Sequence, residues 1–503
     1  MPSFRRIHRP RLFLSPRRKA EAESAPIETV RSRLFASIDA RVRLHPGQSG
    51  VVELRDARDA FAARAHLADA AEYTLDIQYY IWRNDMSGML LFEAIHRAAD
   101  RGVRVRLLID DNNTNRELDE ILGALDAHPN IEVRLFNPFL MRRFRTLNIY
   151  DFSRLNRRMH NKSFTADHLV TIVGGRNIGD EYFDAHNEIA FVDLDVMAIG
   201  PVVDQVTKDF ERYWRSESAY PLKSILRRPT RATAAEITKA AQAVTQEPAA
   251  RAYVRALENS RFVQDLIAGT LHYHWSAVRI LSDDPSKVLG RAAPHEMISE
   301  RLLGALGQPT RELQIISAYF VPTRAGTEML ADLARSGVKI TVLTNALEAT
   351  DVAVVHAGYA KRRKQLLKAG IEIYELKRMS ELTSGRDRKL TGNSGSSLHA
   401  KTFVVDRERL FVGSFNFDPR SARLNTELGF LIESPAMATE VAKTFESEIP
   451  ATSYQVRLAR HGLLQWVERR GKETIVHKRE PGATPLKRLM LYLMSKLPIE
   501  WLL

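Results

Sequence analysis

The sequence predicts an α/β fold built from two copies of one unit that share one job. Three observations carry this prediction. A His-x-Lys-x-x-x-x-Asp motif occurs twice, and the second copy follows the first by 239 positions. A strand, helix, strand pattern precedes each copy, and the glycines that end the two helices lie 235 positions apart. Later expected strands begin at Ile131 and Ile371, 240 positions apart, so one repeat with a few small insertions explains all three offsets.

The expected elements follow the same order in both halves. In the first half, residues 73–82 and 103–111 are predicted strands, and residues 89–102 between them form a helix that ends at Gly102. In the second half the strands are 313–321 and 338–345, and the helix 328–337 ends at Gly337. Apolar strands that alternate with amphipathic helices indicate a sheet covered on both faces.

Changes in composition divide the chain into five segments. We expect a basic N-terminal extension at 1–45, the first unit at 46–215, a connector at 216–276, the second unit at 277–450 and a C-terminal segment at 451–503. The connector is rich in Ala and Arg, which predicts helices that bridge the two units. The C-terminal segment begins with a predicted hairpin that turns at Arg470-Gly471.

The chain ends in an amphipathic pattern. Leu486, Leu489, Leu493 and Leu497 fall on one helical face, with Lys487 among the cations beside them. Such a helix is either docked on the core or lies in a membrane interface. The aromatic residue Trp501 near its end favours the interface.

Charge and cysteine content limit the possible function classes. The formal net charge of +13 and the pI near 9.8 favour an anionic partner, which is either nucleic acid or an anionic membrane surface. The absence of cysteine excludes disulfides and thiolate catalysis. No apolar run approaches the roughly 20 residues that span a bilayer, and the basic N-terminus lacks the apolar core of a secretory signal.

Several common catalytic signatures are missing. The sequence has no Walker A loop, no G-x-S-x-G elbow and no H-E-x-x-H motif. No cluster of His, Asp and Glu has the spacing of a metal site, so we expect neither a metal nor a cofactor. The positive charge that a metal would supply is expected from Lys162, Lys401 and a protonated histidine.

The repeated motif carries phosphate chemistry. His160 and Lys162 are two residues apart, as are His399 and Lys401, so each pair shares one face of a strand. Lysine neutralises phosphoryl oxygens, and histidine can attack phosphorus or move a proton. A small-residue turn follows each motif and carries an asparagine that can donate to phosphate. These asparagines, Asn177 and Asn416, are again 239 positions apart.

These motifs resemble the phospholipase D superfamily, in which two such motifs meet in one active site. The segments around residues 76–114, 157–183, 351–370 and 397–430 are similar to its bacterial cardiolipin synthase branch, and the resemblance covers roughly residues 45–503. The resemblance implies two α/β sandwich units that are related by a pseudo-twofold axis and share one active site. It implies that His160, Lys162, Asp167, His399, Lys401 and Asp406 form the catalytic set, with Asn177 and Asn416 binding phosphate.

The role of the two motif aspartates stays open at this point. Asp167 and Asp406 either take part in catalysis or fix a loop. Glu427 matches the acid that orients an imidazole in the family, and Asp193 is the corresponding residue of the first half. Its neighbours Glu188 and Asp195 are the alternatives to Asp193.

The resemblance implies a cardiolipin synthase that transfers a phosphatidyl group between phospholipids. His160 would attack the donor phosphodiester and form a phosphatidyl-histidine, while His399 serves as acid and then base; the two roles can be exchanged. A hydrolytic phospholipase D and a phosphodiesterase acting on nucleic acid are the alternatives. We expect phospholipid substrates, an anionic membrane surface and no nucleic-acid partner, with the protein peripheral at the cytoplasmic face of the inner membrane. The sequence identifies no accessory protein.

Overall fold

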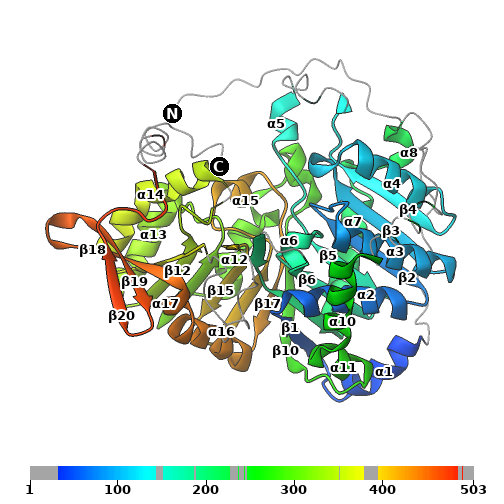
Figure 1. The fold of residues 1–503 in the computed structure, drawn as a ribbon, viewed down its shortest axis with the longest axis horizontal. Coiled ribbons are helices and arrows are strands. Elements are labelled where there is room, and N and C mark those ends of the chain that lie inside the picture. The colour runs from blue at the N-terminus through cyan, green and yellow to red at the C-terminus, as the bar shows by residue number, and fades with distance from the viewer. Residues whose placement is uncertain are drawn as a thin grey trace.

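The two predicted units are present as two α/β halves that lie side by side (Figure 1). The computed structural model describes residues 32–142, 145, 151–185, 189–226, 236, 239, 243, 246–350, 352–378, 395–484 and 490. Within this part of the chain, no helix is both long and apolar enough to cross a membrane.

The sheet of the first half is mixed. Its three central strands are parallel and correspond to the apolar runs predicted from the sequence, while the remaining strands pair antiparallel. The order across the sheet is β9-β4-β3-β2-β5-β6-β8-β1. The strands are β1 (Ser49–Leu54), β2 (Thr74–Tyr79), β3 (Arg104–Asp110), β4 (Ile131–Phe136), β5 (Ser163–Ala166), β6 (Val170–Gly174), β8 (Asp195–Ile199) and β9 (Ala219–Pro221).

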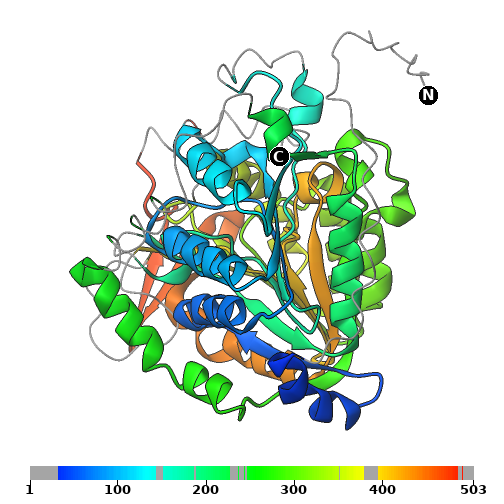
Figure 2. The same cartoon turned by 90° about the vertical axis from the view of Figure 1, so that its right-hand side faces the viewer.

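Helices cover both faces of this sheet. Three of them stack on one face and bury the largest apolar core, and a fourth covers the other face (Figure 2). Each of the three stacked helices starts at a side-chain cap, namely Asp56, Asp85 and Asn115. The stacked helices are α2 (Ala57–Ala70), α3 (Met86–Asp100) and α4 (Arg116–Asp126), and the fourth is α7 (Pro201–Trp214).

The second half repeats this architecture, in the order β20-β19-β18-β13-β12-β11-β15-β16-β17-β10. Gly102 and Gly337 have φ of 96° and 98°, and each lies in the turn between a helix and the parallel strand that follows it. The strands are β10 (His274–Ser282), β11 (Glu312–Ser317), β12 (Lys339–Asn345), β13 (Glu372–Leu376), β15 (Lys401–Val405), β16 (Arg409–Gly413), β17 (Leu428–Glu433), β18 (Ser453–Leu458), β19 (Leu464–Arg470) and β20 (Glu473–His477). The main helices are α12 (Ile298–Leu306), α13 (Thr323–Arg335), α14 (Ala353–Lys368) and α16 (Pro435–Ser447).

The halves are joined by strands and by an apolar interface. The edge strands β1 and β10 pair antiparallel, and β7 (Ile189–Val192) of the first half pairs in parallel with β14 (Gly395–Leu398) of the second. A core of buried apolar residues from β6, β8, β16 and β17 fills the interface, with Val173, Val196, Val412 and Phe430 among them. The docking of the halves is therefore part of the folded core.

The described part of the predicted connector includes α10 (Pro248–Glu258) and α11 (Arg261–Ile267), which pack on α2 and bury Tyr253 and Val263 in the core of the first half. Part of the N-terminal extension also forms a helix, α1 (Arg33–Arg43), that is capped by Ser32. The predicted hairpin around Arg470-Gly471 is present as β19 and β20. The predicted amphipathic helix at the C-terminus lies outside the described residues, except for Met490.

Short helices complete the described chain. Most have a single turn, and several lie in the loops around the repeated motifs. They are α5 (Phe152–Leu155), α6 (Asp180–Phe183), α8 (Leu222–Ile225), α15 (Pro419–Arg423) and α17 (Ile449–Thr452), with the 3-10 turns η1 (Asp111–Asn113), η3 (Pro285–Leu289), η4 (Pro294–Glu296) and η5 (Arg460–Gly462).

Candidate active site

The two motifs lie at equivalent edges of the two halves. Ser163 pairs with Gln78 near the carboxyl end of β2, and Lys401 pairs with Ser317 at the carboxyl end of β11. His160 is three residues before Ser163 and His399 is two residues before Lys401, so both stand at the carboxyl edge of the parallel strands. This edge is where open α/β sheets place their ligand sites. We call it the catalytic edge.

Each histidine is hydrogen-bonded to a carboxylate of the opposite half. His160 Nδ1 lies 2.8 Å from Glu427 Oε2, and His399 Nδ1 lies 2.5 Å from Asp193 Oδ2. Both carboxylates are buried. The alternatives to Asp193 do not occupy this position: Asp195 pairs with Arg64 at 2.7 Å, and Glu188 lies outside the described residues.

Backbone bridges between the halves produce this crossed arrangement. The amide of His160 donates to the carbonyl of Thr426 at 2.9 Å, and the amide of His399 donates to the carbonyl of Val192 at 2.8 Å. The residue after each carbonyl is the orienting acid, Glu427 or Asp193. One backbone hydrogen bond therefore places each imidazole beside its carboxylate, and the site is complete only when the halves dock.

The two carboxylates are supported differently. Glu427 accepts hydrogen bonds from Ser414 Oγ at 2.5 Å and from Ser421 Oγ at 2.7 Å. Position 175, which is equivalent to 414, is glycine, and a Cβ there would lie 2.3 Å from Asp193 Oδ1. Gly175 thus makes room for Asp193, whereas the equivalent Ser414 binds Glu427. Sequence analysis missed both serines, although the Gly–Ser difference at one repeat position was visible.

The lysines bring positive charge into a buried site. Lys162 and Lys401 are 1% exposed, and each Nζ donates to the carbonyl oxygen of its own motif histidine, at 2.6 Å for Lys162. Burial lowers the pKa of Lys162 to about 7, with the charge of Lys401 from the other half acting in the same direction and the charge of Glu427 acting against it. An anionic phosphodiester bound beside the lysines would stabilise their charged forms.

Burial also holds both histidines in the neutral form. It lowers the pKa of His160 to about 4, against the raising effect of the Glu427 charge. Burial, followed by the charge of Lys401, lowers the pKa of His399 to about 3. A neutral imidazole whose Nδ1 proton is held by a carboxylate presents Nε2 as a nucleophile or base.

The two asparagines are buried beside the site and are held by the backbone. Asn177 Oδ1 accepts from the amide of Ile81 at 3.2 Å, and its Nδ2 donates to Tyr182 Oη at 3.0 Å. Asn416 Oδ1 accepts from the amide of Tyr319 at 3.4 Å. In both asparagines the side-chain oxygen is already hydrogen-bonded, which leaves the amide nitrogen as the group that could donate to a phosphate. That these residues bind phosphate stays a prediction.

Two tyrosines flank the histidines and were not identified from the sequence. The ring of Tyr80 meets that of His160 edge to face, with centroids 5.1 Å apart. Tyr182 meets His399 in the same way at 5.2 Å. Both rings restrict the imidazole orientation and add to its burial. Neither tyrosine belongs to a repeated motif, so no spacing in the sequence pointed to them.

The motif aspartates lie away from the histidines. The carboxylate of Asp167 accepts from the amides of Tyr73 and Thr74 at the amino end of β2, and Asp406 accepts from those of Arg311 and Glu312 at the amino end of β11. Both aspartates have positive φ in the turn after the motif strand. The structure therefore does not bring them to the catalytic edge, and their contacts favour the loop-fixing alternative.

We expect Asp406→Asn to reduce stability rather than chemistry. Besides three backbone amides, Asp406 accepts from the Thr310 hydroxyl at 2.9 Å, and an amide nitrogen in its place would face donors. The free energy of unfolding should fall by about 2 kcal/mol, measured by urea denaturation. The control is Glu408→Gln, which alters an exposed ion pair of little expected value. Unchanged stability together with lost turnover would instead assign Asp406 to catalysis.

Lys162 should set an alkaline limit to activity. Its pKa of about 7 means that its positive charge is lost as pH rises through neutrality, whereas His160 stays neutral down to about pH 4. We expect kcat/KM, which reports groups of the free enzyme, to fall above about pH 7. Lys162→Arg should keep the charge and move this limb to higher pH. An alkaline limb at the same pH in both proteins would assign it to another group.

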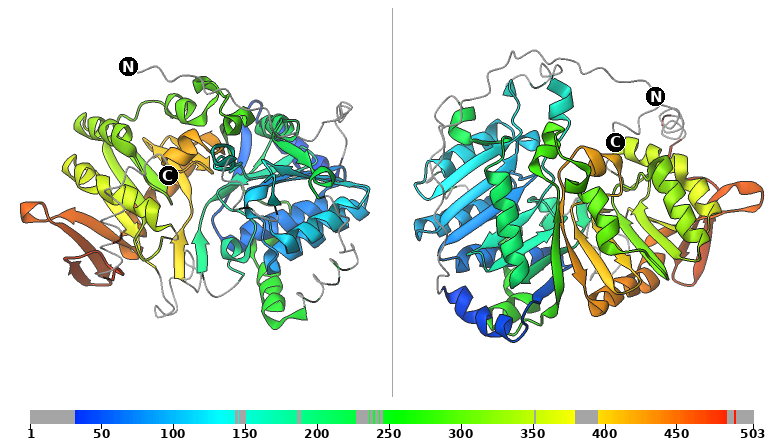
Figure 3. Two further views of the ribbon diagram at one scale, coloured as in Figure 1. Left: turned by 90° about the horizontal axis from the view of Figure 1, so that it is seen from above. Right: turned by 180° about the vertical axis from the view of Figure 1, so that it is seen from behind.

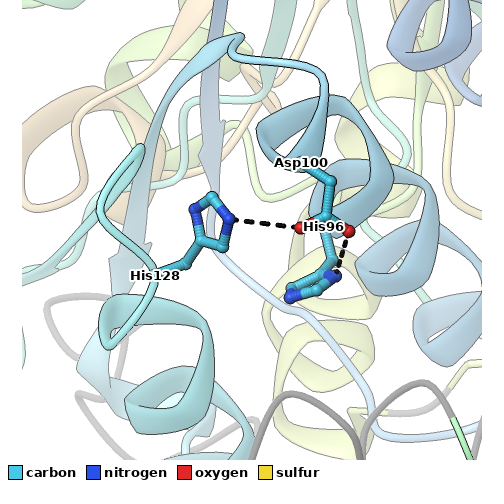
Figure 4. Close-up of side chains that lie close together, drawn as sticks. All are labelled: His96, Asp100 and His128. Carbon is cyan, nitrogen blue, oxygen red and sulfur yellow. Dashed lines mark ion pairs between the residues drawn. The ribbon is translucent and has the colours of Figure 1, made fainter.

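A cluster of His96, Asp100 and His128 lies at the opposite edge of the first half (Figure 4). Asp100 bridges the imidazoles, at 3.2 Å from His96 Nδ1 and 3.3 Å from His128 Nε2. His128 Nδ1 accepts the amide of Asn130 at 3.1 Å, which leaves the proton of a neutral ring on Nε2, the atom that faces Asp100. Through these hydrogen bonds the cluster connects α3 to the loop that precedes β4.

The comparison with protein families agrees with the duplicated site. The model described as "Cardiolipin synthase, PLD-like domain" matches residues 65–214 and 302–449, and each matched segment contains one motif. The chain belongs to the cardiolipin synthase family of phospholipase D-like proteins.

Relatives of this family extend over nearly the whole chain. Cardiolipin synthase C of Escherichia coli K12 is 54% identical over 473 residues, which cover 94% of this chain and all of the relative. The major cardiolipin synthase ClsA of Bacillus subtilis 168 is 24% identical, with 79% of this chain and 68% of the relative covered. The crystal structure of phosphatidylserine synthase from Haemophilus influenzae has a similar fold, with a TM-score of 0.58 over 94% of this chain and 100% of that chain, at 14% identity.

Proposed function

We propose that this member of the family is a cardiolipin synthase, which transfers a phosphatidyl group from phosphatidylethanolamine or phosphatidylglycerol to the free hydroxyl of a phosphatidylglycerol. The crossed pairing of His160 with Glu427 and of His399 with Asp193 carries this proposal. It provides two oriented imidazoles at one phosphate, which is what a double displacement at phosphorus needs. The likeness to cardiolipin synthases over 94% and 79% of this chain supports the choice of substrate.

The reaction proceeds in two displacements. His160 Nε2 attacks the donor phosphorus, the bond to the head-group alcohol breaks, and His399 gives that alcohol its proton. The anionic phosphodiester raises the pKa of His399, which burial and Lys401 lower in the empty site. His399 then removes the proton of the acceptor hydroxyl, whose oxygen attacks phosphorus and releases His160. Lys162 and Lys401 stabilise the phosphoryl oxygens throughout.

We further propose that the enzyme works at an anionic membrane surface. Its substrates are lipids, and the formal net charge of +13 suits the anionic head groups of a bacterial membrane. We place it peripherally at the cytoplasmic face of the inner membrane, without a nucleic-acid partner.

The lipid products provide the direct test. The protein is incubated with vesicles that contain phosphatidylglycerol, phosphatidylethanolamine or both, and the products are identified by mass spectrometry. Cardiolipin formed from phosphatidylglycerol alone, or only from the mixture, identifies the donor. Phosphatidic acid as the sole product would mean that water replaces the acceptor and that the enzyme is a hydrolase.

Chelators should leave this activity intact. The proposed reaction draws its positive charge from Lys162, Lys401 and protonated His399, so no step depends on a divalent ion. We expect the rate of cardiolipin formation to be unchanged after dialysis against EDTA. A loss of activity that a divalent ion restores would contradict the assignment of phosphate neutralisation to the lysines.

A further inference from the structure

The two halves differ most at their outer edges. In the first half, the strand beside β4 is β9, which has three residues. In the second half, the equivalent position beside β13 is taken by the six-residue β18, which is extended by β19 and β20. The resulting arm lies at the end of the molecule farthest from the first half (Figures 1 and 3). It also lies beyond residue 449, where the family match ends.

The register places one turn of this arm at the catalytic edge. Ser453 of β18 pairs with Leu376 at the carboxyl end of β13, and Glu468 of β19 pairs with Tyr454. β19 therefore runs toward that edge and passes it, so that the turn between β19 and β20 lies beyond the end of β13. The opposite end of the arm holds the loop between β18 and β19, and Lys478 and Arg479 follow the end of β20 there. The chain then turns back, because Glu480 pairs with Arg363 and Gly482 lies against Glu348.

The turn is basic and exposed. Arg469, Arg470 and Lys472 are exposed, and Arg378 is exposed where the chain leaves β13 at the same edge. We call these four residues the basic edge. Glu473 is the exposed acid of the turn, whereas Glu468 is 3% exposed and already accepts from Arg470 and His477. The basic edge therefore presents more positive than negative charge to solvent.

We propose that the basic edge binds the anionic head groups of the bilayer and holds the catalytic edge against the membrane. This proposal rests on the proposed function, since it assumes that the phosphates to be reached belong to lipids. Exposed cations on a turn that projects past the sheet can lie in the plane of the head groups, where each contributes to attraction by an anionic surface. Because only the second half carries the arm, the pseudo-symmetric enzyme would meet the membrane asymmetrically.

The test compares two charge reversals on the same arm. Arg469→Glu/Lys472→Glu alters the basic edge, and Lys478→Glu/Arg479→Glu makes the same change in net charge at the opposite end. Binding of the full-length proteins to phosphatidylcholine vesicles, with and without phosphatidylglycerol, is measured by flotation at low and high salt. We expect the basic-edge variant to bind the anionic vesicles about tenfold more weakly at low salt. The control variant should bind much as the wild type does, and high salt should remove the difference.

Equal weakening by both reversals would mean that only net charge matters and would overturn the proposal, as would wild-type binding by the basic-edge variant. Because reversal could disturb the turn, Arg469→Gln/Lys472→Gln is measured in parallel with thermal unfolding, and it should give a smaller loss in the same direction. Turnover of a short-chain, water-soluble phosphodiester should be unchanged in every variant. The two proposals fail in different experiments. Lipid products other than cardiolipin would contradict the proposed function but not the vesicle-binding result. Unaltered vesicle binding by the basic-edge variant would contradict the role of the basic edge but not cardiolipin synthesis.

Discussion

His160→Ala and His399→Ala should each lower lipid turnover by more than about 10⁴-fold, because one phosphate needs both a nucleophile and an acid. The double variant should be no worse than the poorer single variant, since either loss already stops the two-step reaction. The rates are followed by cardiolipin formation in mixed vesicles. Both residues are buried at the catalytic edge, so each variant is first compared with the wild type in thermal unfolding.

The two single variants should differ when the donor has a leaving group that departs without a proton. His399→Ala keeps the nucleophile, so incubation with a p-nitrophenyl phosphodiester, labelled in the part that is transferred, in the absence of acceptor should leave an acid-labile label on the protein. His160→Ala should give no label. Substantial turnover by either variant would refute the shared site. A label on His160→Ala but not on His399→Ala would exchange the roles that the resemblance to the superfamily assigns to the two histidines.

Much of the fold could be predicted because its information is local and repeated. The apolar runs that became β2, β3, β11 and β12 are bounded by turns, and the matched offsets identify the duplication. The placement of α10 and α11 could not be predicted in the same way. Their amphipathic faces require an apolar partner, but nothing in the sequence says which half supplies it, and α2 does.

The site shows the same limit. The residue types and spacing identified His160, His399 and their lysines, because each histidine and its lysine are two residues apart in the sequence and therefore form a local pattern. The crossing of the carboxylates depends on the docking of the halves, which the sequence does not specify locally. The position of Asp167 was easier to predict from the sequence. The four residues of β5 span about 13 Å, so an acid beyond them lies at the other end of the strand from His160.

The crossed pairing leads to a second large effect. Asp193→Asn and Glu427→Gln should each reduce turnover on the order of 10²- to 10⁴-fold, because an amide neither fixes the reactive tautomer nor stabilises the imidazolium. The charges of these acids raise the pKa of their histidines, against burial. Removing either charge therefore makes its imidazole still harder to protonate. Glu427→Asp should recover part of the activity, because it restores a carboxylate between Ser414 and Ser421.

A substrate with an activated leaving group can show which histidine each acid serves. The p-nitrophenolate of a phosphodiester departs without a proton, so the first step then needs the nucleophile but not the acid. Asp193→Asn, like His399→Ala, should still release a burst of p-nitrophenol. Glu427→Gln, like His160→Ala, should lose it. The reverse pattern, with the burst lost in Asp193→Asn and kept in Glu427→Gln, would mean that each acid serves the histidine of its own half. Because Asp193 accepts from His399 at 2.5 Å and Glu427 from His160 at 2.8 Å, we expect the crossed pattern.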